Sequence, residues 1–408
     1  MSAASNTTDP RPANNVAAAL AETPRRPDGR PVLTEVQSHL HPAGSTAPTD
    51  HPVPSGLEEV WRFTPLKRLH GLHVDVPLTG PDISVDVAAS APVRVETVGA
   101  DHPAKGLSGY LPTDRVSARA WQAATGTLLV TVPAGAAAPE PTVINLTGSS
   151  TEPAAGHIVV SAEPNSTATV VLVYEGTAVR ADNVEVVLAD GAQLSLVSVF
   201  DWADDAVHVT HQHARIGRDA SLKHVAVTFG GDLVRMNASV TYDGPGGSVE
   251  MFGLYFADAG QHLEQRLFID HNEPHTRSHV DYKGALQGDG AHTVWIGDVL
   301  IRMVAEGIDT YESNRNLVLT DGARADSVPN LEIETGEIIG AGHASTTGRF
   351  DEEQLFYLRS RGIPEEEARR LVVHGFFADI IHRVGVPGIE KRLLAALEDE
   401  LAAVGAGV

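Results

Sequence analysis

The sequence predicts a mainly β protein whose core is a parallel β-helix, a solenoid in which each coil stacks on the coil before it. Short runs rich in β-branched residues dominate the region from about residue 83 to residue 339, as at 169–173, 184–188 and 194–199. Turn dipeptides bound these runs, and long helical periodicity is absent. We expect the β-helix core to span residues 84–347.

The predicted turns recur along this region. They are Asp190-Gly191, Arg218-Asp219, Gly246-Gly247, Asp289-Gly290 and Asp321-Gly322. The residues that follow these turns, at 192, 220, 248, 291 and 323, lie 28, 28, 43 and 32 positions apart. A repeating unit of one turn and two or three strands indicates a solenoid, because each coil buries its inward side chains only when the next coil covers it. We expect the strands after these turns to stack in chain order. A β-sandwich has similar strands but gives no reason for the repeated turn.

The N-terminal region predicts a disordered arm over residues 1–54. This arm holds nine of the 25 prolines among Ala, Ser, Thr and Asn, and such a segment buries too little apolar surface to offset its ordering entropy. A short helical segment is expected over residues 55–83. Ser55 and Glu58 have the spacing of a capping box, and Trp61 and Phe63 are expected to dock the segment on the core.

The C-terminal region predicts a small helical module over residues 348–408. Acidic residues at 351–353 open a first helix that ends at Gly362, and Pro364 begins a second. Pro387-Gly388 separates the second helix from the last. A module of this size is thin for a core of its own. We therefore expect its apolar faces to pack on the solenoid, on a partner or on both.

The acidic composition and the lack of cysteine exclude several classes of function. The chain has 30 Lys and Arg against 53 Asp and Glu, a formal charge of −23, whereas nucleic acids and anionic membranes attract a cationic surface. It has no cysteine, which excludes disulfides, thiolate nucleophiles and Cys-ligated clusters held by this chain alone. No apolar stretch is long enough to span a membrane, and no secretory pattern opens the sequence. We expect a soluble, cytoplasmic protein.

The common catalytic motifs are missing from the sequence. No lysine follows a glycine, so there is no nucleotide-binding P-loop, and there is no G-x-S-x-G nucleophile motif. The run from His271 to His275 resembles a zinc-protease motif only superficially, because Pro274 opposes the helix on which two histidines would share a face.

Histidines are therefore the main candidates for chemistry. His211 and His213, close to His208, would share one face of a strand, and we favour outward, solvated side chains over a metal site. His271 and His275 flank a predicted turn, for which structural hydrogen bonding is the simpler interpretation. The roles of these five histidines stay open.

His343 is the most approachable histidine. It lies in a run of small residues from Gly340 to Gly348 that leaves its imidazole open to another chain or to an ion. Glu332 and Glu334 precede it within one coil length. We take His343 as the first metal-ligand candidate and Glu332 and Glu334 as less favoured ones.

Several segments resemble the SufB/SufD family of iron–sulfur cluster assembly proteins. Residues 342–363, which read GHASTTGRFDEEQLFYLRSRGI, resemble a long and specific motif of that family. Residues 311–319 resemble its Q-x-N-x-N-L-L-L segment, and His271 to His275 followed by Lys283-Gly284 also match. Residues 59–66 resemble the W-[RK]-[YF]-T motif found near the start of SufD members. The resemblance is dense over 253–384, lighter over 57–252 and absent from the arm.

Within this family the sequence is most similar to SufD. SufB members carry a cysteine in the coil before the histidine-containing segment, where this chain reads Pro329-Asn330-Leu331-Glu332. SufD members rely on a histidine that matches His343. They often have a cysteine just before it, and because Gly340 and Ala341 stand there, the role of that thiol does not transfer.

The resemblance implies a fold, partners and a cargo. SufD-like chains form a right-handed parallel β-helix with helical N- and C-terminal modules. They pair with a SufB-like scaffold through the β-helix and bind a SufC-like ABC-type ATPase through the C-terminal helices, so this chain would be a non-catalytic subunit. Iron or an Fe–S cluster would be held transiently at the SufB interface by His343, shared with SufB and not bound tightly by this chain alone. The candidate SufC anchors are Phe356, Tyr357, Arg361, Phe376 and Phe377.

Two other functions remain possible at this point. The chain could be a purely structural paralogue without a ligand role, or a β-helix enzyme acting on carbohydrates. The iron content of the purified complex separates the first reading from these. A homodimer of the isolated chain and a role for FAD stay open.

Overall fold

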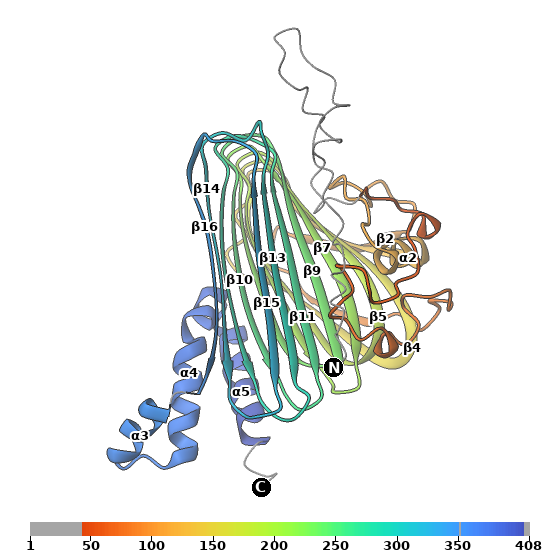
Figure 1. The fold of residues 1–408 in the computed structure, drawn as a ribbon. Helices are drawn as coiled ribbons and strands as arrows, with labels where there is room; N and C mark the ends of the chain where they lie inside the picture. Colours follow the sequence, from red (N-terminus) through yellow and green to blue (C-terminus); the bar gives the residue numbers. More distant parts are fainter. Residues whose placement is uncertain (1–42, 351, 404–408) are drawn as a thin grey trace, which may run out of the picture. The chain divides into compact units, whose positions relative to one another are not determined.

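The computed structural model describes residues 43–350 and 352–403, and the residues from Gly44 onward form one compact unit (Figure 1). Most of the predicted disordered arm, residues 1–42, lies outside the described residues. Residues 44–54, which we expected to belong to that arm, are ordered around the short 3-10 helix η1 (Pro48–Asp50). Arg115 holds this segment by donating hydrogen bonds to the carbonyl oxygens of Pro48 and His51.

The core is the predicted parallel β-solenoid. Its strands are β3 (Gly126–Val132), β4 (Thr142–Ala162), β5 (Thr167–Leu188), β6 (Gln193–Trp202), β7 (Val207–Gly217), β8 (Ser221–Gly230), β9 (Leu233–Asp243), β10 (Ser248–Ala257), β11 (His262–His271), β12 (Arg277–Leu286), β13 (His292–Ile301), β14 (Ile308–Val318), β15 (Arg324–Ile333) and β16 (Ile338–Arg349). From β6 onward each coil has two strands. The even-numbered strands β6 to β16 pair in parallel on one face, and the odd-numbered strands β7 to β15 pair in parallel on the other. The long strand β5 belongs to both faces, because its first half pairs with β6 and its second half with β7.

Two series of turns, one at each side of the coil, explain the uneven spacing in the sequence. The turns at Gly191, Asp219 and Gly246 lead into even-numbered strands, whereas those at Gly290 and Gly322 lead into odd-numbered strands. The gap of 43 residues is therefore about one and a half coils. The stacking order is confirmed for β6, β8 and β10, but our single series of turns was wrong.

Each turn of the first series needs a left-handed backbone conformation. The residues at this position have positive φ angles, and their backbone N–H groups each donate to a carbonyl of the following coil. They are Asn165, Gly191, Asp219, Gly246, His275 and Gly307. Glycine, asparagine and aspartate adopt this conformation most readily. His275 is the exception in the series, and its position gives it a structural role in the turn.

The interior of the solenoid is mainly apolar and contains a few neutral histidines. Alternate side chains of every strand point inward and form one continuous buried cluster of Val, Leu, Ile, Ala and aromatic residues. His224 lies inside, where its Nε2 is 2.8 Å from Oε1 of Gln212. Burial lowers its pKa to about 4, and burial also lowers to about 4 the pKa of His271, which points inward, and of His211, which is buried on the outward face.

These histidines predict acid sensitivity. The folded state keeps His224 neutral, whereas the unfolded chain binds a proton below pH 6.5. The free energy of unfolding should therefore be fully retained above pH 6.5 and fall toward pH 4, by about 1.4 kcal/mol per pH unit for each such histidine. Denaturation curves at several pH values should show a shallower decline for His224→Gln and an unchanged decline for His382→Gln, whose side chain is exposed. Equal declines in the two variants and the wild type would contradict this assignment.

The N-terminal region is not the helical segment that we expected. The capping-box contact forms, since the side chain of Glu58 accepts a hydrogen bond from the backbone N–H of Ser55. The residues that follow make turns and the 3-10 helix η2 (Leu66–Leu69), however, and no α-helix. The helix of this region is α2 (Arg115–Ala123), which the sequence analysis missed and which Asp114 caps by accepting from the Ser117 N–H. Two antiparallel strands, β1 (Ser84–Ala88) and β2 (Arg94–Gly99), pair with β4 and β3.

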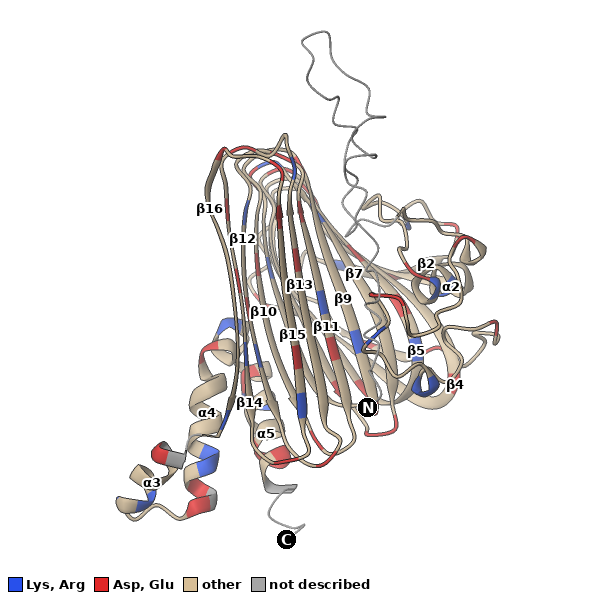
Figure 2. Ribbon diagram, viewed as in Figure 1, with Lys and Arg blue, Asp and Glu red and all other residues tan. Residues whose placement is uncertain are grey.

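The segment with the W-[RK]-[YF]-T pattern docks on the odd-numbered face. The ring of Trp61 stacks on the guanidinium of Arg235 (β9), with 3.9 Å between Cζ and the ring centroid. The Thr64 hydroxyl donates to Oε2 of Glu264 (β11) at 2.7 Å and accepts from Arg235. Oε1 of Glu264 lies 3.3 Å from Nη1 of Arg235. Figure 2 shows acidic and basic residues of this face on the neighbouring strands β9 and β11, and on β15, which lies beyond β13.

The C-terminal helices are α3 (Glu352–Ser360), α4 (Glu365–Val384) and α5 (Pro387–Ala403). Helices α4 and α5 lie along the even-numbered face (Figure 1). Phe377 and Ile380 of α4 and Leu393 of α5 share one buried cluster with outward side chains of that face such as Phe252 and Val225. Arg392 of α5 adds ion pairs to Glu175 and Asp201. The predicted packing of this module on the solenoid is confirmed.

Candidate functional site: the open end of the solenoid

The last coil leaves one end of the solenoid uncovered. At the opposite end, β1 and β2 occupy the edges of β4 and β3. Strand β15 pairs only with β13, and β16 pairs only with β14, so each has one free edge among the described residues. No side chain of either strand is buried. A free edge offers unpaired N–H and C=O groups to another strand, and the inward side chains of this coil offer a surface for another chain.

His343 lies on β16 with its imidazole facing this open end. The strand register places it beside Glu312 of β14, and Glu312 lies in the stack of inward side chains that continues through Val280 and Met251. In the middle of the solenoid the next coil would cover such a side chain. Because no coil follows β16 among the described residues, the side chain of His343 is 42% exposed. The absence of a covering coil, more than the small neighbours that we considered, makes the ring accessible.

Glu312 is the buried partner of His343. Its side chain is only 2% exposed, and its Oε1 lies 3.8 Å from Nδ1 of His343. No hydrogen-bond partner reaches this oxygen within the part of the chain that the structure describes. Burial, together with the negative charge of Asp298, raises the pKa of Glu312 to about 8.

Polar side chains line the interior next to this pair. Asn314 donates to the Tyr255 hydroxyl, which donates to Asn316, and Asn316 donates back to Asn314, each at 2.8 Å. Asn316 also donates to Ser327 of β15 at 3.0 Å. The interior of the last two coils is thus lined by a connected set of polar side chains. A polar lining of this kind favours a polar or ionic occupant at the open end over an apolar one.

The comparisons with known proteins agree with this fold. The family model described as "SUF system FeS cluster assembly, SufBD core domain" matches residues 145–376, which is more than half of the chain. The chain belongs to the SufB/SufD family.

Individual relatives give the same result. The chain is 55% identical to an iron–sulfur cluster assembly SufBD family protein of Mycobacterium tuberculosis, over 86% of this chain and 89% of the relative. It is 29% identical to the iron–sulfur cluster assembly protein SufD of Bacillus subtilis, over 59% of this chain and 56% of the relative. It is 25% identical to SufD of Escherichia coli, over 52% of this chain and 57% of the relative. Membership of this family removes the reason for considering a carbohydrate-active β-helix enzyme.

Two of the candidate metal ligands in this SufB/SufD chain lie away from His343. Leu331 packs inward on β15, so the next residue, Glu332, points outward, and it pairs in register with Leu300 of β13. Glu334 accepts a hydrogen bond at 3.0 Å from the backbone N–H of Met303, which makes it a loop contact. Neither carboxylate is aligned with His343 in the strand register, so their role as metal ligands stays a prediction without support from this geometry. Glu312 is the aligned carboxylate. Its alternation with Asn314 and Asn316 along one strand could have revealed its shared face with them, but not its proximity to His343.

His208, His211, His213 and His271 of this SufB/SufD chain make contacts within the fold. His208 points inward, 3.2 Å from Asp182. His211 and His213 share the outward face, as predicted, but they are not solvated: both bond to the Ser239 hydroxyl beneath the ring of Tyr110. The imidazole of His271 is buried, and its two nitrogens bond to the hydroxyls of Thr276 and Ser278. Hydrogen bonding is thus confirmed for His271.

The proposed SufC anchors divide into surface and core residues. Phe356 and Tyr357 of α3 are 74% and 57% exposed, and Arg361 stacks on the Tyr357 ring. Phe377 is fully buried against the solenoid, and Phe376 is partly buried beneath Lys283. Phe377 is therefore not a surface anchor, because its ring completes the contact between α4 and the even-numbered face. The remaining surface candidates are Phe356, Tyr357 and Arg361.

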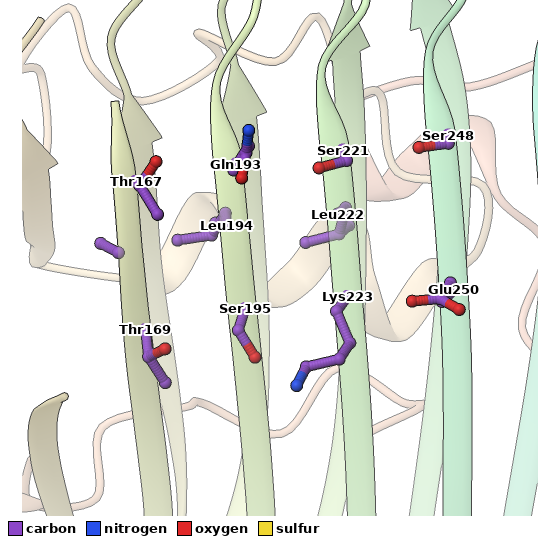
Figure 3. A pocket seen from close by; sticks show the side chains of 11 residues that line it. Thr167, Thr169, Gln193, Leu194, Ser195, Ser221, Leu222, Lys223, Ser248 and Glu250 are labelled. Carbon is purple, nitrogen blue, oxygen red and sulfur yellow. The ribbon is translucent and has the colours of Figure 1, made fainter. Parts of the chain in front are cut away.

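A groove on the even-numbered face offers little chemistry. It has a volume of about 280 Å³, and Figure 3 shows Thr169, Ser195, Lys223 and Glu250 side by side on the four strands that line it. Lys223 already donates to the carbonyl oxygen of Arg383 at 2.9 Å. The lining residues include no histidine and only one carboxylate, so the groove lacks a set of metal ligands or catalytic groups.

Two further properties concern the residues that the structure describes. They contain no cluster of three or more histidine and acidic side chains suited to hold a metal ion. No helix among them has the length and apolar character needed to cross a membrane.

Proposed function

We propose that this chain is a SufD-like, non-catalytic subunit that pairs with a SufB-like scaffold at the open end and helps iron enter the nascent cluster. The observation that carries the proposal is the open end itself, with two free edge strands and an accessible imidazole above a polar interior. Ile333 and Ile339, at the C-terminal end of β15 and the N-terminal end of β16, add exposed apolar surface there. Imidazole suits iron, and the cysteine-free chain needs a partner to supply thiolate ligands. The relatives named SufD support the assignment.

The direct test is reconstitution. The chain is co-expressed with the SufB-like and SufC-like proteins of the same organism, and the purified complex is assayed for iron and sulfide under anaerobic conditions. We expect a complex that acquires both when cysteine desulfurase, iron and ATP are supplied. A stable complex whose iron content does not depend on this chain would favour the purely structural paralogue, and failure to form a complex would reject the assignment.

The ATPase is proposed to dock on α3. Replacing Phe356 and Tyr357 together by alanine should weaken binding of the SufC-like ATPase by about tenfold or more, because exposed aromatic side chains are frequent hot spots of binding energy. The double variant should bind the SufB-like partner as the wild type does. The control is Leu57→Ala, which truncates a 90% exposed apolar residue outside the C-terminal helices and should leave the binding of both partners unchanged. Surface-immobilised ATPase can measure these affinities. ATPase binding within twofold of wild type for the double variant would contradict docking through α3.

Substitution is a cleaner test than removal of the whole module. Deleting residues 351–408 would also remove α4 and α5 and expose the apolar side chains that they cover. A loss of ATPase binding in that truncation could then follow from misfolding alone.

A further inference from the structure

We propose that Glu312 is a second ligand, together with His343, for a ferrous ion held at the open end, with the remaining ligands supplied by water and by the chain that covers this end. The inference rests on the proposed function, which makes His343 an iron ligand, and it assigns an additional role to a residue outside the sequence candidates. The ion is cargo for the cluster and not a permanent cofactor of this chain.

The distance between the two side chains suits a shared ion. Nδ1 of His343 and Oε1 of Glu312 are 3.8 Å apart. This is too long for a hydrogen bond. An ion with metal–ligand bonds of about 2.1 Å, typical of nitrogen and carboxylate ligands, can bridge up to about 4.2 Å. A metal ion therefore fits between these two atoms with little movement of either side chain.

Oε1 of Glu312 lacks the partner that a buried carboxylate oxygen requires. The side chain is only 2% exposed, and no hydrogen bond reaches Oε1 within the described residues. The cationic side chains Arg315 of β14 and Lys283 of β12 lie on the outward face, where Arg315 pairs with Asp281 and Lys283 pairs with Asp379. A buried carboxylate without a cation is costly. A divalent ion at the open end would supply the missing charge.

The facing strand leaves room for this carboxylate. A Cβ atom added to Gly297 on β13 would lie 2.4 Å from Oε2 of Glu312 and 2.4 Å from the ring of Trp295. Only a glycine at this position lets both side chains occupy the interior. The glycine and the indole thus hold the carboxylate in place, with its other oxygen directed toward His343.

A site with two protein ligands binds its ion weakly, so the ion can be transferred to other ligands. The described residues contain no third histidine or acidic group close enough to complete it. Nitrogen and oxygen ligands accept iron but bind it less firmly than thiolates bind a cluster. An ion held by Glu312 and His343 can be passed to thiolates of the covering chain once these become available.

The test measures ferrous ion binding by the assembled complex in anaerobic equilibrium dialysis. Three variants are compared with the wild type: Glu312→Gln, His343→Ala and the double variant. Glutamine keeps the size and hydrogen-bonding capacity of a protonated carboxyl group, so melting temperature and partner binding should not change. The matched control is Glu332→Gln, which alters a carboxylate of the same coil on its outward side.

We expect Glu312→Gln and His343→Ala each to weaken ferrous ion binding by about tenfold or more, since the loss of even an outer-shell group at a metal site costs about 10–100-fold. The loss of affinity in the double variant should be smaller than the product of the two single losses, because both residues bind one ion. Its affinity should approach that of the weaker single variant. Glu332→Gln should bind as the wild type does.

Two outcomes would overturn the inference: binding by Glu312→Gln within twofold of wild type, or an equal loss in Glu332→Gln. If His343→Ala loses iron while Glu312→Gln retains it, the proposed function stands and the role of Glu312 is rejected. If His343→Ala also retains iron, the iron role proposed for this end is rejected as a whole.

Discussion

Replacement of His343 by alanine is expected to leave the protein folded and the complex assembled while abolishing cluster formation. The side chain is 42% exposed, and its Nδ1 lies 3.8 Å from Oε1 of Glu312, too far for a hydrogen bond. Truncation of such a side chain typically changes the free energy of unfolding by no more than about 0.5 kcal/mol. Loss of the imidazole nitrogen, by contrast, removes the accessible ligand at the open end. Thermal melting, co-purification with both partners and the iron content per complex measure the three expectations.

A different outcome would identify His343 as a structural residue. In that case the variant would melt at a lower temperature, because a buried partner would lose its hydrogen bond at a cost of about 1–3 kcal/mol. Normal iron content per folded complex would accompany the lower melting temperature. His382→Ala, which truncates an exposed histidine of α4, serves as the control for nonspecific effects of removing an imidazole.

Glu264→Gln is expected to be the most destabilising of the conservative changes considered. Arg235 is almost fully buried, and Glu264 is its counter-charge at 3.3 Å. Although burial alone would raise the pKa of Glu264, the charge of Arg235, a hydrogen bond from His262 and the charge of Arg266 hold that pKa well below its usual range. Removing one member of such a buried pair costs about 3–5 kcal/mol, because the other charge is left uncompensated. Urea denaturation measures the loss.

The same pair allows a matched rescue. The double variant Arg235→Met, Glu264→Gln removes the unpaired charge and should recover part of the stability lost in Glu264→Gln. Glu250→Gln, at an exposed position, should stay within about 0.5 kcal/mol of wild type. Because Thr64 bonds to Glu264 and Trp61 stacks on Arg235, Glu264→Gln should also accelerate proteolysis near Trp61. Unchanged stability and unchanged proteolysis would show that the segment docks through its apolar contacts alone.

Much of the fold could be predicted because a solenoid repeats its local chemistry. Each coil shows the same alternation of inward apolar and outward residues, and turns mark its boundaries. The single turn series was wrong because only some left-handed turn positions carry glycine: Asn165 and His275 occupy the same place with φ angles of 56° and 59°. The region before β3 was less predictable, because its order depends on docking. Trp61 and Arg115 are fixed by residues far along the sequence or by loop carbonyls.

The candidate site shows the same limit. His343 could be found because the motif around it resembles the SufB/SufD family. Glu312 was missed because its proximity to His343 comes from strand register across the coil, which distances along the sequence do not reveal. The burial of Phe377 could not be separated from the exposure of Phe356 by composition, since both are aromatic residues of amphipathic helices.

The one-sided closure of the solenoid has a consequence for its synthesis. Strands β1 and β2 flank the first coils, and the later coils are added in the direction in which the ribosome releases the chain. Each folded coil is a template for the next, and domains fold as they emerge, N-terminal part first. The strands β15 and β16 emerge after all the other strands, and their edges keep this templating capacity. A partner that docks early covers these edges. A chain made in excess of its partner, by contrast, is expected to pair with other copies of itself through them. The balance between the expression levels of the two subunits would then set the fraction of chains that assemble correctly.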